Sequence, residues 1–204
     1  MAKGGLGAAP ARDLRHGLPE RLRLETAELH AAVEAAIDLP GSVRTRSDYV
    51  TLLQRLHRIH ACLEEQLAVG VWAGQWPDIG LDIAAHRRAH LVAADLGRLG
   101  APAMTRAVPA LRLTSFGQAL GCLYVLEGSS LGGRIVAGVI RSAIGEVPTT
   151  FFDGAGRNHP APWRAVCAAL RRFEAYCASG DVLVGARETF LAFGGHLAAV
   201  APLA

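Results

Sequence analysis

Apolar residues recur at steps of three and four along most of the chain, and this spacing constrains the fold more than any other feature. Strand-like alternation is scarce, and alanine and leucine dominate over valine, isoleucine and tyrosine. An apolar position at every third or fourth residue forms one stripe on an α-helix. A chain of 204 residues is most simply one domain. We therefore predict an all-α, single-domain, multi-helix bundle.

Helix boundaries follow from capping residues and from glycine and proline breaks. Residues 1–18 are expected to form a flexible N-terminal extension, and residues 19–204 one helical domain. Ser47 is a plausible cap of the second helix, and Thr114 or Ser115 of the fourth. The predicted helices cover residues 19–38, 48–68, 83–99, 116–144, 163–178 and 181–200. Irregular connections are expected over residues 70–77 and 145–162.

Charge and cysteine usage exclude several classes of protein. The net charge is only +3, and the basic residues, nearly all arginine, are scattered among acidic ones, so nucleic-acid binding is not expected. Four cysteines without a CxxC pair favour a reducing compartment and no zinc site. The most apolar stretch, residues 120–144, is interrupted by Glu127, Arg134 and Arg141, so we expect no membrane span. Without a secretory signal pattern, we expect a cytoplasmic protein.

A histidine stands among apolar residues in the first predicted helix. The residues that share its face are Leu22, Thr26, His30, Val33 and Ile37. His30 is therefore expected to point inward, either as a hydrogen-bonded core residue or as a metal ligand. Glu34 lies one turn later, where its carboxylate can fix the imidazole tautomer and leave one nitrogen for a metal. Arg23 lies two turns before it and could meet an anionic ligand edge.

A glycine-rich segment interrupts the apolar fourth helix. Gly121, Gly128 and Gly132 fall on one face, and Gly133 follows. Each interior glycine costs a helix about 1 kcal/mol relative to alanine, so a compensating contact is expected. Close helix packing is one explanation, a loop is a second, and a flat ligand lying against bare backbone, where the helix kinks, is the third. A histidine facing such a surface describes a slot that fits heme.

Two segments carry a resemblance to a known family: Thr26–Glu34, TAELHAAVE, and Leu123–Gly133, LYVLEGSSLGG. They resemble the bacterial biliverdin-producing heme oxygenases, most closely the group that supplies biliverdin to bacteriophytochromes. The resemblance covers residues 19 to 200 approximately. It implies heme between a proximal helix bearing His30 and a distal helix kinked at Gly128 and Gly132. Heme would be cofactor and substrate, oxidised by O2 to biliverdin with release of CO and ferrous iron.

The resemblance also implies roles for individual residues. His30 would be the iron ligand, and Gly128, Ser129 and Gly132 would form the catalytic distal wall. Eukaryotic members have an aspartate at the position of Ser129, so hydroxyls or backbone carbonyls are expected to hold the distal water here. The expected heme contacts are Arg23, Thr26, Glu34, Tyr124, Gly128, Gly132, Gly133, Arg187 and Phe190. Because the chain has no flavin or nicotinamide fingerprint, a separate ferredoxin or reductase would donate the electrons.

Two other functions fit part of this pattern. A heme carrier or sensor would need the same slot without turnover. A non-heme di-iron oxidase needs inward carboxylates and histidines, commonly as Glu-x-x-His, and the chain has no such motif. His57 with His60, and His86 with His90, have helix-face spacing but no carboxylates at matching steps, so we interpret them as surface or structural residues.

Overall fold

The structure, a computed structural model, describes residues 16–39, 41–104, 111–154, 156, 160–177 and 179–197. Over these residues the chain is helical and contains no strand. The α-helices are α1 (Leu18–Glu25), α2 (Ala27–Ile37), α3 (Arg46–Val69), α4 (Ala89–Arg98), α5 (Phe116–Gly128), α6 (Gly133–Ile144), α7 (Thr150–Asp153), α8 (Pro160–Tyr176) and α9 (Gly180–Leu197). Short 3-10 helices follow α3: η1 (Ala73–Gln75), η2 (Pro77–Ile79) and η3 (Ile83–His86). The predicted all-α class is confirmed; residues 1–15 of the expected extension lie outside the described residues.

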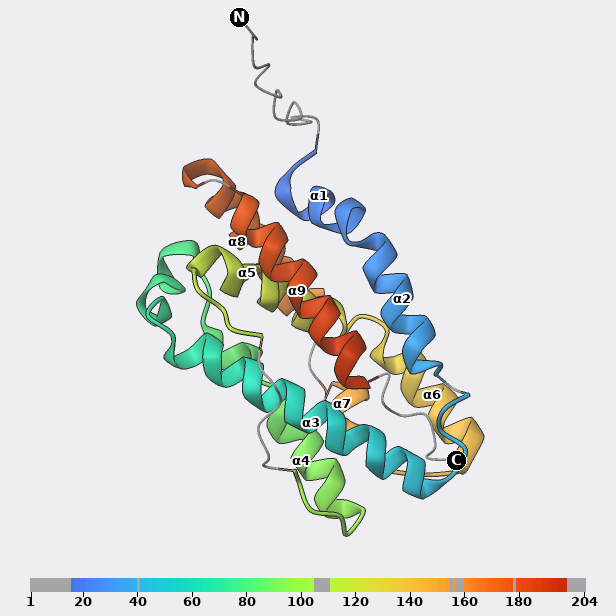
Figure 1. The fold of residues 1–204 in the computed structure, drawn as a ribbon. Helices are drawn as coiled ribbons and strands as arrows, with labels where there is room; N and C mark the ends of the chain where they lie inside the picture. The colour runs from blue at the N-terminus through green and yellow to red at the C-terminus, as the bar shows by residue number, and fades with distance from the viewer. Residues whose placement is uncertain are drawn as a thin grey trace, which may run out of the picture.

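Helix α5 is the centre of the bundle. Most of its residues are buried, and α9 packs along it over most of its length. Helix α3 pairs with α4, α1 lies against α8, and α2 lies along α9, as Figure 1 shows. The helix that carries the glycine-rich segment is therefore fixed on one side by α9, and α9 separates it from part of the N-terminal helices.

Glycines permit the close approach of α5 and α9. A Cβ atom at Gly121 would overlap the carbonyl oxygen of Val182, and one at Gly185 would overlap that of Gln118. Only a missing side chain on each helix lets the two backbones come this close. Helix packing, the first of the explanations that the sequence left open, therefore accounts for Gly121.

Two predicted helices contain a break that the sequence did not indicate. The first breaks at Thr26, whose buried hydroxyl donates to the carbonyl oxygen of Leu22 at 2.7 Å. The third begins as η3 and turns at Arg87 and Arg88 before α4 starts. In both cases the apolar spacing continues across the break, so periodicity alone cannot show it.

The fourth predicted helix, residues 116–144, consists of α5 and α6, which are bent by 45° relative to each other. Ser129–Gly132 connect them, a segment that we call the α5–α6 junction. The kink expected among the glycines is thus present.

Helix caps agree with the predictions in one case and differ in another. Ser115 accepts a hydrogen bond from the backbone N–H of Gln118 and caps α5 as predicted. The cap of α3 is Thr45, not Ser47. Thr45 and Asp48 form a reciprocal capping box, which satisfies two backbone donors at once.

Within the part of the chain that the structure describes, no single helix has the length and apolarity to cross a membrane. The bent pair of α5 and α6 passes that test only when the two are taken together.

Candidate functional site

Helix α2 carries His30 and has no buried residue. Leu29, Val33 and Ile37 pack only partly against the core. The His30 side chain is 53% exposed, and its ring meets that of Phe190 on α9 edge-on, with centroids 5.7 Å apart. The expectation that His30 points into the core is therefore wrong. The helix leaves its own apolar face incompletely covered, which leaves the imidazole accessible.

Glu34 lies beside His30 as the spacing predicts. Its carboxylate oxygen Oε2 is 3.7 Å from His30 Nδ1. This distance is too long for a direct hydrogen bond, but a small rotation or one water would connect the two groups. Thr26 does not reach this region with its hydroxyl, because the hydroxyl is buried and bonded to Leu22. Its place is at the α1–α2 break, one helical turn before His30.

The glycines at the α5–α6 junction have three different surroundings. A Cβ atom at Gly132 would meet nothing within 4 Å, so open space lies in front of it. Gly128 faces the ring of Trp163, whose nearest atom would be 3.4 Å from an added Cβ. Gly133 packs against the backbone of Phe152 in α7. Of the glycines assigned to a ligand surface, Gly132 has the open position and Gly133 faces a neighbouring helix.

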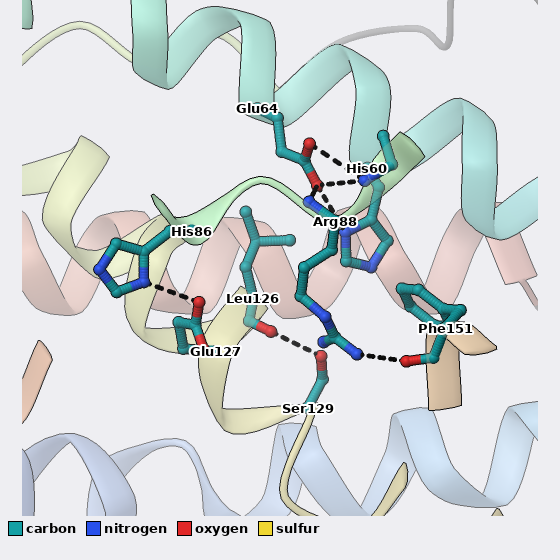
Figure 2. A network of polar contacts seen from close by, with 9 residues as sticks. His60, Glu64, His86, Arg88, Leu126, Glu127, Ser129 and Phe151 are labelled. Carbon is teal, nitrogen blue, oxygen red and sulfur yellow. Dashed lines mark hydrogen bonds and ion pairs between the residues drawn. The ribbon is translucent and has the colours of Figure 1, made fainter. Parts of the chain in front are cut away.

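Two serines hold the junction through bonds to their own helix. The Ser129 hydroxyl donates to the carbonyl oxygen of Leu126 at 2.8 Å (Figure 2), and the Ser130 hydroxyl donates to that of Glu127 at 2.7 Å. Ser129 is exposed, whereas Ser130 is buried. With its proton engaged, the Ser129 oxygen can still accept a hydrogen bond from water.

An open groove runs along α6 beyond the junction. It is a shallow depression that is largely open to solvent. It is lined by Arg134, Ile135, Gly138, Val139, Ser142 and Ala143. The Ile135 side chain is 74% exposed and that of Leu131, in the junction, 49% exposed. A second apolar surface is therefore uncovered, in addition to that of α2.

Polar and aromatic residues near α1 complete the predicted set. Tyr124 is buried one turn before Gly128, and its ring lies 5.2 Å from that of Trp163. Burial raises the pKa of Tyr124 to about 12, against a smaller opposing effect of the Arg23 charge, so its hydroxyl is neutral and Arg23 is near enough to act on it. Arg23 itself is exposed. Arg187, on α9, is 3.7 Å from Glu25 at the end of α1.

Comparison with known proteins identifies the family. The chain is 34% identical over 157 residues to a heme oxygenase of Xanthomonas campestris pv. campestris, an alignment that spans 75% of this chain and 90% of that protein. The chain belongs to the heme oxygenase family. It superimposes with a TM-score of 0.73 on the heme oxygenase of Neisseria meningitidis, solved with NO and CO bound, at 19% identity and with 92% and 94% of the two chains covered. No protein-family profile matches the chain.

The residues of this heme oxygenase fit the group that gives the family its name. A planar macrocycle needs apolar walls and one iron ligand. The structure leaves apolar surface uncovered on α2, at Leu131 and at Ile135, and it leaves the His30 imidazole accessible. Exposed apolar side chains and an accessible imidazole are the features that a heme site needs.

The structure also contains two buried histidine–glutamate pairs in this heme oxygenase that the sequence analysis missed. His60 Nδ1 lies 3.2 Å from Glu64 Oε1, and His86 Nδ1 lies 2.7 Å from Glu127 Oε1 (Figure 2). The statement that these histidines lack carboxylates at matching steps is wrong, because Glu64 follows His60 by four residues. His86 and Glu127 are 41 positions apart, so sequence spacing gives no signal for this second pair.

The Glu64 carboxylate holds the start of α4. It accepts hydrogen bonds from the backbone N–H groups of Arg88 and Ala89, at 2.9 and 3.0 Å. Burial acts to raise the pKa of Glu64, but the bonds from His60 and these two amides hold it below its ordinary value. Burial lowers the pKa of His60. His60 and Glu64 are thus structural, as the sequence analysis expected of this histidine.

A di-iron centre finds no support in the described residues. They contain no group of three or more His, Cys, Asp or Glu side chains that could hold a metal ion. In each pair the histidine bonds to its glutamate, and Glu64 also bonds to backbone N–H groups at the start of α4. Neither pair therefore forms half of a carboxylate-bridged metal site.

Proposed function

We propose that heme binds between α2 and the α5–α6 junction, with the His30 imidazole as the iron ligand. The observation that carries this proposal is that α2 has no buried residue although it presents His30 and several apolar side chains. Helices in a folded domain normally bury such a stripe. A macrocycle seated on α2 would cover it, and we propose that its other side covers Leu131 and Ile135, which are both exposed.

His30 is well placed to be held in one orientation. The ring edge contact with Phe190 limits its rotation, and Glu34 is close enough to fix the protonated nitrogen. When bound, heme would supply the iron centre at which O2 is activated, and it is itself the substrate that is opened to biliverdin, CO and ferrous iron. A neutral imidazole favours this outcome over the early O–O cleavage that a thiolate ligand promotes.

The distal side of the proposed site is formed by backbone. Gly132 leaves open space where a side chain would otherwise stand, so a diatomic molecule has room there. Helix α6 begins at Gly133, and the N-terminus of a helix favours negative charge near it. The Ser129 oxygen can accept from a water and so hold a proton carrier at this end of the site. We assign catalytic roles to Gly128, Ser129 and Gly132 on this basis.

Arginines at the α1–α9 edge suit the two heme carboxylates. Arg23 is exposed and close enough to Tyr124 to influence its pKa. Arg187 is exposed and engaged by Glu25 in an ion pair of 3.7 Å, which is weak enough to exchange for a propionate. A guanidinium can bind a carboxylate in bidentate fashion, which fixes direction as well as affinity. The edge of the ring that carries the propionates would therefore lie toward α1.

The electrons would come from outside the chain. We propose a ferredoxin or a reductase as donor, and, on the resemblance of the glycine segment, a bacteriophytochrome as one acceptor of biliverdin. We propose a cytoplasmic location, where such partners would be available. We propose no nucleic-acid or membrane partner.

Heme titration followed by reduction tests the proposed function. The purified protein is expected to bind heme one to one and, with O2 and a reductant, to lose its Soret band while biliverdin absorbance appears. A ferrous–O2 complex that persists under reductant would indicate a carrier or sensor instead. Iron uptake without heme binding would contradict the proposal altogether.

A further inference from the structure

Glu127 is a buried carboxylate at the last turn of α5, directly before the glycine-rich junction. Its side chain is 3% exposed, and that of His86 is 6% exposed. A small cavity next to His86 is lined by four apolar residues, Leu67, Ile83, Leu123 and Leu126, together with Glu64 and Arg87. Burying two such groups costs desolvation, and a buried pair is commonly retained because it specifies one arrangement.

The junction lacks the side chains with which helices usually fix their position. Gly132 has none, Leu131 is half exposed, and the hydroxyls of Ser129 and Ser130 bond only to carbonyls of α5. At its far end the junction is fixed by Gly133, which fits against the backbone of Phe152. At its near end the backbone is tied to Glu127, because Ser130 donates to the Glu127 carbonyl oxygen through both its N–H, at 3.1 Å, and its hydroxyl, at 2.7 Å.

The side chain of the same glutamate ties this end to another part of the fold. Figure 2 shows Glu127 pointing to His86, with a hydrogen bond of 2.7 Å. His86 is the last residue of η3, which leads into α4. An ionised carboxylate can only accept, so His86 Nδ1 donates the proton. Glu127 thus links η3 to the junction, because its side chain bonds to His86 and its backbone carbonyl accepts from Ser130.

We propose that Glu127 and His86 are positioning residues that anchor the α5–α6 junction and so set the distal wall of the heme site. Neither residue needs to touch the ligand. The link to heme rests on the function proposed above, whereas the anchoring itself is a property of the chain without ligand.

Hydrogen exchange on the ligand-free protein tests the anchor. The reporters are the N–H groups of Ser130, Leu131 and Gly133, which donate to the carbonyls of Glu127, Gly128 and Ser130. The double variant His86→Leu/Glu127→Leu removes both members of the pair, so neither is left buried without the other, and the fold is expected to persist. Exchange of the three reporters should accelerate about tenfold or more, while amides of α9 keep their rates, because only local opening changes.

Two further variants separate anchoring from general loss of stability. Glu127→Gln retains an oxygen that accepts from His86 and is expected to keep the reporters within about threefold of wild type. Glu64→Gln alters the other buried pair, His60 with Glu64. It should change amide exchange at Arg88 and Ala89 and leave the exchange rates of the junction reporters unchanged. Wild-type exchange at the junction in a folded double variant, or equal acceleration throughout the chain, would overturn the proposal.

Heme binding by the same variants then distinguishes the two proposals. If the anchor sets the distal wall, the double variant should bind heme with an altered Soret maximum and Glu127→Gln with the wild-type maximum. An unaltered maximum in a double variant with a loosened junction would overturn the link to the distal wall. Failure of the wild-type protein to bind heme would refute the proposed function but leave the exchange result as a test of the anchor.

Discussion

At the scale of single residues, His30 makes the sharpest prediction. Its side chain is half exposed and meets Phe190 edge-on, so His30→Ala is expected to lower the free energy of unfolding by less than about 1 kcal/mol. Heme coordination should be lost, with a changed Soret band and no biliverdin formed. Absorption titration and denaturant unfolding measure both effects, with His57→Ala on α3 as the control. Unchanged spectra and turnover would contradict the ligand assignment.

Gly132 and Gly97 offer a matched comparison of two open positions. A Cβ atom would meet nothing within 4 Å at either residue, but Gly97 lies on α4. Leucine in place of Gly97 should be neutral or stabilising by up to ~1 kcal/mol, because glycine is a poor helix former. Gly132→Leu should leave folding intact yet lower O2 or heme binding at least about tenfold, which corresponds to ~1.4 kcal/mol. Equal heme and CO affinities in both variants would argue against a distal wall at Gly132.

His60 makes stability depend on pH. Burial lowers its folded pKa below the ordinary 6.5, so the unfolded chain binds more protons than the folded one once the pH falls below 6.5. The free energy of unfolding should therefore decrease from pH 6.5 downward to the folded pKa, by at most about 1.4 kcal/mol per pH unit for this group. His60→Gln should flatten the slope, measured by urea unfolding between pH 5 and 7.5. His196, whose pKa burial also lowers, leaves a residual slope of the same sign. A slope in His60→Gln as steep as that of wild type would contradict this account.

At the scale of helices, the contact of α5 with α9 depends on Gly121 and Gly185. An added Cβ at either position overlaps a backbone carbonyl oxygen of the facing helix, and backbone cannot move aside as a flexible side chain can. Gly121→Ala and Gly185→Ala are each expected to destabilise by ~1–3 kcal/mol, in spite of alanine's higher helix propensity. Gly97→Ala is the control, with an expected gain. Thermal unfolding compares them, and stabilisation by Gly121→Ala would mean that the helices lie further apart.

Periodicity and caps predicted most helices but not their breaks. The apolar stripe identifies α3, α8 and α9 with small shifts at their ends, and α5 with α6 as one predicted helix, because that stripe exists in the sequence itself. The break at Thr26 depends on a hydroxyl that bonds to a carbonyl of its own helix, and the turn at Arg88 depends on Glu64 from another helix. Both breaks are set by contacts in the folded protein, which the helix propensity of the local sequence does not reveal.

The candidate site likewise has some features that the sequence reveals and others that only the fold reveals. Residue type and spacing single out His30 and the glycines, and their role in the site stays a prediction. The exposure of His30 could not be predicted, since it depends on what α2 packs against. The pairing of His86 with Glu127 needs the fold that brings η3 to the end of α5.

At the scale of the whole molecule, one layer of the bundle is incomplete. Helix α5 is enclosed by its neighbours, whereas α2 contacts α9 and buries no residue. A helix of 11 residues gains little stability from propensity alone and depends on tertiary packing. Local unfolding should therefore start at α2 in the ligand-free protein.

Heme should complete that layer and protect α2 in particular. A ligand that binds only the folded state stabilises it by about 2.7 kcal/mol at a hundredfold excess over Kd. Amides of α2 are expected to exchange more slowly by about the same factor of a hundred, while those of α5, already enclosed, change least. Exchange measured with and without heme tests this, and His30→Ala should reduce the protection because the iron–imidazole bond is lost. Protection that is uniform over α2, α5 and α8, or absent from α2, would show that the ligand binds elsewhere.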